Sequence, residues 1–240
     1  MSTLEDFNFK ELFPTCMNVY DELAKNKPRP YDSNLNEPYK NIRKKLNVET
    51  QDGKFISHCK ELINYLYYIK DKQNSDVKKR CNYLNYMLKH VLKTSKCNDK
   101  NSKTFYDKII GEREISYIMN SSNVCECFIQ DLDNNIFSVL LELNGLYEII
   151  SKPGLKSYKN KYCYDMYKEI SGIYDNSNNE CLRRVVKNFK KENMAYFPES
   201  INELNFTLHI IMKESHKKNN ALIYMIFFLH YLYTSYGSFL

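Results

Sequence analysis

The sequence predicts an all-α fold, and three observations lead to this prediction. Apolar residues recur at three- and four-residue spacing through most of the 240-residue chain, as they do on the buried face of an amphipathic helix. Runs that alternate apolar and polar residues, which are typical of strands, are scarce. Six glycines are too few for the turns of many hairpins. We therefore expect one helical domain over residues 1–215, because no composition shift or repeat marks a second one.

Six segments carry the helical spacing, and the apolar residues that define each of them should lie on its buried face. In chain order these are Leu12, Cys16, Val19, Tyr20 and Leu23; Phe55, Cys59, Leu62, Ile63, Leu66 and Ile69; Cys81, Leu84, Leu88 and Val91; the run Val124–Ile150; Cys163, Met166, Tyr167 and Ile170; and Cys181, Val185 and Phe189. The long run should end at Ser151-Lys152-Pro153-Gly154, since proline and glycine stop helices.

Loops are expected between these segments. Lys25–Tyr39 contains Pro28, Pro30 and Pro38, and a proline inside a helix removes a hydrogen bond and clashes with the preceding turn. Polar stretches predict further loops over the ranges Asp71–Asp76, Ser95–Lys103 and Asn176–Asn179.

The charge pattern argues against a nucleic-acid partner. The chain carries 35 basic and 29 acidic side chains, for a net charge of +6. The two signs are interspersed, as in Glu112-Arg113-Glu114 and Lys190-Lys191-Glu192, whereas a nucleic-acid-binding face gathers its basic residues into one strip. We interpret these charges as an ordinary solvated surface.

The cysteines are candidates for disulfide bonds. There are eight of them, at Cys16, Cys59, Cys81, Cys97, Cys125, Cys127, Cys163 and Cys181. None forms a C-x-x-C pair and no two histidines lie four residues apart, so a zinc site has little support. Eight is an even number and more than an intracellular protein of this size usually carries, which favours disulfides that staple the helices. Cys125 and Cys127 should take different partners, because residues two apart point to different sides of a helix. The alternative is a set of reduced core thiols, and the pairing stays open.

Other motifs do not predict catalysis or metal binding. His58 and Cys59 are neighbours in sequence and therefore point in different directions on a helix, which does not make a catalytic dyad. Asp131, Asp133, Asn135 and Glu142 approach the spacing of a calcium-binding loop, but the position that needs glycine is Ile136, so a polar helix N-terminus fits better. Nucleotide-binding and nucleophile-elbow motifs are absent from the sequence. We expect no enzymatic activity, no cofactor, no metal and no small-molecule substrate.

The C-terminal segment Ala221–Leu240 predicts a membrane anchor. It contains no Asp, Glu, Lys or Arg, and a helix of this length rises about 30 Å, the thickness of the hydrocarbon core of a bilayer. Membrane lipid is therefore an expected partner. The alternative is a buried C-terminal helix, since only the first part of the segment, before Thr234, is solidly apolar. No signal peptide is visible in Met1–Lys10, which predicts a tail-anchored or unconventionally exported protein.

Three further motifs lie at Arg80–Leu88, Leu141–Glu148 and Tyr233–Leu240. They resemble motifs of the Plasmodium interspersed repeat (PIR) superfamily, and of the VIR-type variant antigens of malaria parasites in particular. Arg80–Leu88 reads R-C-N-Y-L-N-Y-M-L and is similar to the family signature C-x-Y-L-N-Y-W-L, with Met87 in place of tryptophan. Tyr233–Leu240 resembles the family element Y-T-P-L-G-S-W/F-L, with Ser235 in place of proline. Leu141–Glu148 is similar to the family's mid-domain helix. Together the motifs span most of the chain.

The resemblance implies a function that the residues alone do not. It implies a helical, disulfide-bearing ectodomain followed by a single-pass transmembrane helix, in a variant surface antigen exported to the surface or internal membranes of the infected red cell. Its expected role is antigenic variation, immune evasion or adhesion, with host receptors or antibodies as partners. The alternative is an intracellular, membrane-anchored helical scaffold or export-related protein with reduced cysteines, which Lys213, Lys217 and Lys218 before the apolar segment would favour.

Overall fold

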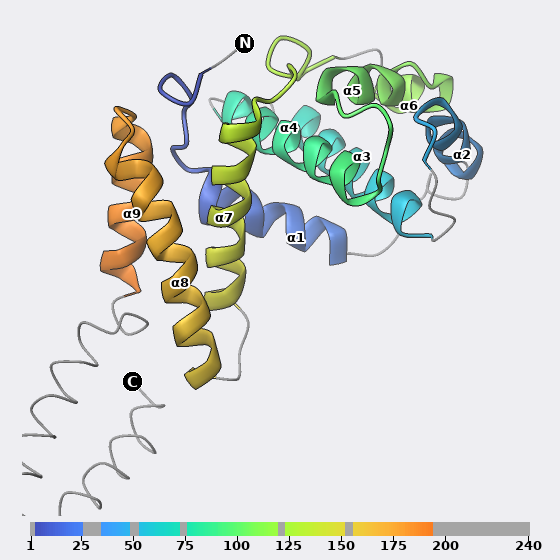
Figure 1. Cartoon of the computed structure of the whole chain (residues 1–240). Coiled ribbons are helices and arrows are strands. Elements are labelled where there is room, and N and C mark those ends of the chain that lie inside the picture. The colour runs from blue at the N-terminus through green and yellow to red at the C-terminus, as the bar shows by residue number, and fades with distance from the viewer. Residues whose placement is uncertain are drawn as a thin grey trace, which may run out of the picture. The chain divides into compact units, whose positions relative to one another are not determined.

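The computed structural model describes residues 3–25, 35–48, 53–72, 76–119, 123–151 and 156–193, and every regular element in these ranges is a helix (Figure 1). The all-α prediction is confirmed. A π-helical turn, η1, covers Leu12–Cys16. The α-helices are α1 (Met17–Lys25), α2 (Asn36–Lys45), α3 (Lys54–Asp71), α4 (Val77–Thr94), α5 (Ser102–Ile110), α6 (Arg113–Ile118), α7 (Asn134–Ser151), α8 (Lys156–Asp175) and α9 (Glu180–Glu192).

The chain divides into two compact units. The first comprises Met1–Gly154 with Asp165–Asn188, and the second comprises Leu155–Tyr164 with Phe189–Leu240. Nearly all of the buried core and the whole candidate site lie in the first unit. None of the helices in the described ranges is long and apolar enough to cross a membrane, and the expected anchor Ala221–Leu240 falls outside those ranges.

Helix α4 is the centre of the first unit. It contacts α3, α5, α7 and the π-helical turn, and Figure 1 shows α3, α4 and α5 lying side by side. The face expected from sequence is confirmed, since Cys81, Leu84, Leu88 and Val91 are all at most 1 % exposed. Because neighbours surround this helix, side chains outside that face are buried as well: Tyr83, Asn85, Tyr86, Lys89 and Leu92.

An aromatic cluster fills the space between α4 and the first helices. Tyr83 is its centre, with four other rings at centroid distances of 5.7–6.0 Å: Phe13, Tyr20, Tyr65 and Tyr86. These pairs are T-shaped or tilted, the arrangements that aromatic quadrupoles favour. The Tyr83 hydroxyl donates a hydrogen bond of 3.3 Å to Oδ1 of Asn144 on α7, so the polar end of the ring is also satisfied.

Side-chain caps begin helices α7 and α5. Oδ1 of Asp133 accepts hydrogen bonds from the backbone N–H groups of Asn135 (2.8 Å) and Ile136 (3.3 Å) at the start of α7. This confirms the interpretation of the calcium-like sequence as a polar helix N-terminus. Oδ1 of Asn101 accepts from the N–H of Thr104 at 2.9 Å and caps α5.

The connection before α9 also ties down the N-terminal segment. Asn179, expected only as part of a loop, is 3 % exposed. Its Oδ1 caps α9 by accepting from the N–H of Leu182 at 2.8 Å. Its Nδ2 donates to three backbone carbonyls of the N-terminal segment, those of Leu4 (2.6 Å), Glu5 (3.2 Å) and Phe7 (2.8 Å). One amide therefore joins residues more than 170 positions apart.

Four local expectations were wrong. Helix α2 begins at Asn36, so Pro38 and Tyr39 are helical; a proline in the first turn is tolerated because its missing N–H would have no helical acceptor there. Helix α5 begins at Ser102, inside the expected loop. The run from Val124 becomes helical only at Asn134. The regular first helix starts at Met17, since Phe13 has extended dihedrals.

The buried face of α9 is also shifted by one residue from the expected one. Leu182, Val186 and Phe189 are fully buried, while Cys181 and Val185 are only partly covered. Both sets of residues have helical spacing. Because Cys181 and Leu182, and likewise Val185 and Val186, are adjacent apolar residues, the spacing alone does not show which set is buried.

Leu84→Ala and Leu88→Ala should each lower the free energy of unfolding by about 2–5 kcal/mol, because both side chains are buried and truncation leaves a cavity. Urea melts of each variant measure the change. Leu141→Ala is the matched control, since Leu141 is 42 % exposed on α7 and should lose well under half as much. Equal losses at all three positions would contradict the assigned burial.

The buried tyrosines should make the protein sensitive to alkali. Burial raises the pKa of Tyr20, Tyr65, Tyr83 and Tyr86 above the ordinary value of 10.0. A raised pKa means that the folded state keeps these hydroxyls neutral, so their contribution to stability is present below pH 10 and is lost as the pH rises and the unfolded chain ionises.

Tyrosinate absorbance followed with circular dichroism tests this expectation. Ionisation of the cluster should coincide with loss of the helical signal, and Tyr83→Phe should make the unfolding free energy less dependent on pH above 10. Complete ionisation of all 21 tyrosines with the helical signal unchanged would show that the cluster is solvated.

Candidate functional site

The structure pairs two of the eight cysteines. A disulfide joins Cys81 on α4 to Cys125, which lies in the turn before α7, with 5.4 Å between their Cα atoms. The other six carry free thiols. Cys125 and Cys127 do have different environments, since Cys127 is exposed. Cys16, Cys59, Cys97 and Cys163 are buried, and Cys181 is partly covered.

The buried thiols are poorly suited to nucleophilic chemistry. Burial raises the pKa of Cys59 well above its ordinary value of 9.0, and it raises those of Cys97 and Cys163 to about 11. A thiol nucleophile needs the opposite shift, because only the thiolate attacks. His58 therefore has no activated cysteine beside it. Burial is the main cause of the raised pKa of Cys59, and Cys97 raises it further.

The residues of the calcium-like motif serve other contacts. Oδ1 of Asp131 accepts from Nζ of Lys89 at 2.8 Å, and Asp133 caps α7. Glu142 lies further along α7, where burial raises its pKa above 4.5. In the part of the chain that the structure describes, no three His, Cys, Asp or Glu side chains gather in a way that could hold a metal ion.

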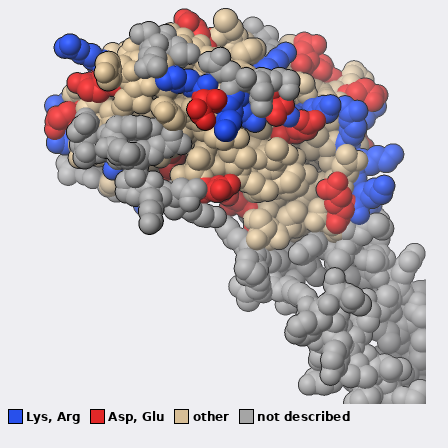
Figure 2. All heavy atoms as spheres, turned by 180° about the vertical axis from the view of Figure 1, so that it is seen from behind, with Lys and Arg blue, Asp and Glu red and all other residues tan. Residues whose placement is uncertain are grey.

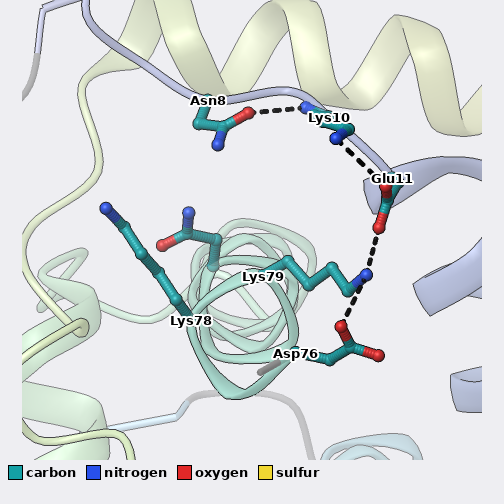
Figure 3. A pocket seen from close by; sticks show the side chains of 7 residues that line it. Asn8, Lys10, Glu11, Asp76, Lys78 and Lys79 are labelled. Carbon is teal, nitrogen blue, oxygen red and sulfur yellow. Dashed lines mark hydrogen bonds and ion pairs between the residues drawn. The ribbon is translucent and has the colours of Figure 1, made fainter. Parts of the chain in front are cut away.

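The candidate site is a charged pocket between the N-terminal segment and the first turns of α4 (Figure 3). Its volume is about 340 Å³. Every side chain that lines it is polar or charged: Asn8, Lys10, Glu11, Asp76, Lys78, Lys79 and Asn82. Such a lining suits a polar or ionic ligand and offers no surface to an apolar one.

A chain of ion pairs forms one wall of this pocket, and Figure 3 shows it running from Lys10 to Asp76. Lys79 bonds to Glu11 and also contacts Asp76 at 2.9 Å, while Lys10 lies 3.5 Å from Glu11. The Lys79 ammonium lowers the pKa of Glu11 below 4.5, and the two carboxylates raise the pKa of Lys79 above 10.5. Glu11 is therefore charged at neutral pH, and both carboxylates are paired with Lys79.

The backbone turns sharply where the chain reaches this wall. Glu11 has φ 60°, in the left-handed region that residues other than glycine rarely adopt. The conformation costs about 1–2 kcal/mol and persists where surrounding contacts hold it. Here the Glu11 carboxylate is held by Lys79, and the adjoining residues Phe9, Leu12 and Phe13 are buried.

Asn8 presents hydrogen-bond donors to the opposite side of the pocket. Its Oδ1 accepts from the backbone N–H of Lys10 at 2.9 Å and from the thiol of Cys181 at 3.4 Å. Because these donors fix which end of the amide is the oxygen, Nδ2 must be the other end. Figure 3 shows that nitrogen pointing into the pocket, across from Lys78.

Sequence reasoning did not find this site. The only local signal was the dense group of charges Asp76–Arg80 in front of an apolar helix face, which is also what an ordinary solvated helix start looks like. The partner of Lys79 lies 68 residues earlier, and no sequence spacing predicts that meeting.

The remaining surface shows no concentration of one sign on the face in Figure 2. Basic and acidic side chains lie next to one another over this face. Among the described residues, ion pairs at close range include Lys45 with Glu112 at 2.5 Å and Lys103 with Asp107 at 2.7 Å.

Comparisons with known proteins add no family assignment: no family model, no curated protein and no solved structure matches this chain.

The disulfide predicts a definite thiol count. The unfolded protein should react with six equivalents of an alkylating agent before reduction and with eight after it, because only Cys81 and Cys125 are joined. Reduction should lower the free energy of unfolding by about 2–5 kcal/mol. Cys127→Ser is the control and should change it little, since Cys127 is exposed. Eight reactive thiols before reduction, or fewer than six, would contradict this pairing.

Proposed function

We propose that this chain is a non-enzymatic variant surface antigen of the PIR type, displayed on the infected red cell and held there by a single membrane span over Ala221–Leu240. Its role would be antigenic variation, immune evasion or adhesion. The proposal rests on the three sequence motifs, and the positions of two of them in the fold support it.

The single observation that carries the proposal is the position of the Arg80–Leu88 motif. Five of its residues are among the most buried of the first unit, each at most 1 % exposed: Cys81, Tyr83, Leu84, Tyr86 and Leu88. Met87, at the position where the family has tryptophan, is only partly covered. If the members of a family have the same core but different surfaces, the residues that they share should be buried ones, as these are.

The second motif supports the same reading. In Leu141–Glu148, three apolar side chains are buried on α7, namely Leu143, Leu146 and Tyr147. Tyr147 stacks on Phe13, with 5.9 Å between ring centroids and 7° between ring planes. Helix α7 therefore packs against the aromatic cluster, whose central ring, Tyr83, belongs to the first motif. The third motif, Tyr233–Leu240, lies outside the described residues.

The surface offers positions for contact and variation. Tyr117 on α6 is 83 % exposed, and an exposed tyrosine adds amphipathic contact area at low entropic cost. Residues that pack against little can change without a large loss of stability, so such positions suit an antigen that varies.

One observation favours the second candidate, an intracellular membrane-anchored scaffold. Six of the eight cysteines carry free thiols, and four of these are buried as small hydrophobic side chains. Reduced core thiols are typical of proteins kept in a reducing compartment. The disulfide between Cys81 and Cys125 favours the exported antigen instead.

Antibody labelling of infected red cells separates the two candidates. Antibodies raised against the refolded protein should label intact cells, and trypsin applied to intact cells should remove the label. A cytosolic parasite protein is the control and should be labelled only after permeabilisation. Labelling of our protein only after permeabilisation, with no loss on trypsin treatment, would reject the surface antigen and favour the scaffold.

A further inference from the structure

We propose that the pocket between the N-terminal segment and α4 binds an oxyanion, the phosphate or carboxylate group of a small polar ligand. The inference rests on the pocket's own geometry and does not depend on where the protein is displayed.

Three side chains of the lining have unused hydrogen-bond donors. Lys78 makes no ion pair or hydrogen bond with any residue that the structure describes, and neither does the side chain of Asn82. Asn8 uses its oxygen for the Lys10 amide and the Cys181 thiol, which leaves Nδ2 directed into the pocket (Figure 3). Two amide groups and an ammonium therefore surround one space.

The charges around this space leave a positive excess. Glu11 is compensated by Lys79 and Lys10, and Asp76 is compensated by Lys79 and Arg80. These three cations and Lys78 together make four positive charges against two carboxylates. The start of α4 adds further positive potential, because the positive end of the helix dipole lies at this end of the helix. Asp76, the N-cap residue, makes no side-chain hydrogen bond to the first backbone N–H groups.

Other classes of ligand fit less well. A metal cation needs several free oxygen ligands, whereas both carboxylates are already paired with lysines or arginine and the Asn8 oxygen accepts two hydrogen bonds. An apolar ligand would find no aliphatic or aromatic wall among the lining residues. An oxyanion takes hydrogen bonds from ammonium and amide donors and gains from the positive excess.

The pocket is large enough to hold a ligand with further atoms beside its anionic group. A cavity of about 340 Å³ is at the lower end of the range for small-molecule sites, and it is larger than a single phosphate needs. The amide of Asn82, which can donate and accept, suits a hydroxyl group next to the anion. Inorganic phosphate and glucose 6-phosphate are therefore suitable probes, with glucose as the neutral control.

The experiment is isothermal titration calorimetry of the full chain with each probe at constant ionic strength. Both phosphates should bind and glucose should not. Tighter binding of glucose 6-phosphate would assign the site to an organic phosphate, and equal binding would assign it to free phosphate. Absence of binding by both phosphates, or equal binding of glucose, would overturn the proposal.

Two variants test the assigned donors. Asn8→Asp keeps the oxygen that accepts from the Lys10 amide but replaces Nδ2 with a negative oxygen, so phosphate affinity should fall at least tenfold. Lys78→Gln removes the unpaired ammonium and should weaken binding about three- to tenfold. Lys44→Gln is the matched control, because Lys44 is an exposed lysine on α2 that does not line the pocket.

Thermal melts by circular dichroism establish that the variants fold, which we expect because Asn8 and Lys78 are both exposed. Unchanged affinity in Asn8→Asp and Lys78→Gln would overturn the assignment of this pocket. So would an equal loss of affinity in Lys44→Gln, because it would show that phosphate responds only to the net charge of the chain.

Discussion

The burial of Tyr83 is the constraint on which the first unit depends. A phenol ring at 1 % exposure brings a large apolar surface out of water, but its hydroxyl must keep a hydrogen-bond partner. Asn144 on α7 supplies that partner, while rings from the π-helical turn, α1 and α3 cover the sides of Tyr83. One side chain thus requires four neighbouring segments to be in place together, which explains why α4 is central and why half of its residues are buried.

Two further connections hold outlying segments to this centre. The Cys81–Cys125 disulfide ties the segment before α7 to α4, one turn from the aromatic cluster. The Asn179 side chain ties the N-terminal segment to the start of α9 through three carbonyls. These connections determine where the candidate pocket forms. With Leu4–Phe7 held at one end and Phe9, Leu12 and Phe13 buried at the other, Glu11 adopts its left-handed turn and meets Lys79.

The two proposals draw on different parts of this arrangement. The surface-antigen proposal relies on motif residues that are buried, because these would be shared by chains with a common frame. The oxyanion proposal relies on exposed side chains of the pocket rim, Asn8 and Lys78, which contribute little to folding. A protein whose core and surface are separated in this way can change its rim residues, and with them its ligand, while α4 and its neighbours stay the same.

The sequence by itself determined the helical class, the buried face Cys81–Val91 of α4 and the polar helix N-terminus around Asp133, because helical periodicity and polar helix starts depend on residues within one or two turns. The sequence analysis placed Pro38 and Ser102 in loops, but both lie in short helices. Helices of this length are stabilised mainly by packing against neighbouring helices, which local sequence does not show. Only the tertiary structure decided that Cys81 meets Cys125, that Asn179 holds the N-terminal segment and that Glu11 meets Lys79. These contacts join residues 44 or more positions apart, and the packing of whole helices, which no local pattern encodes, brings them together.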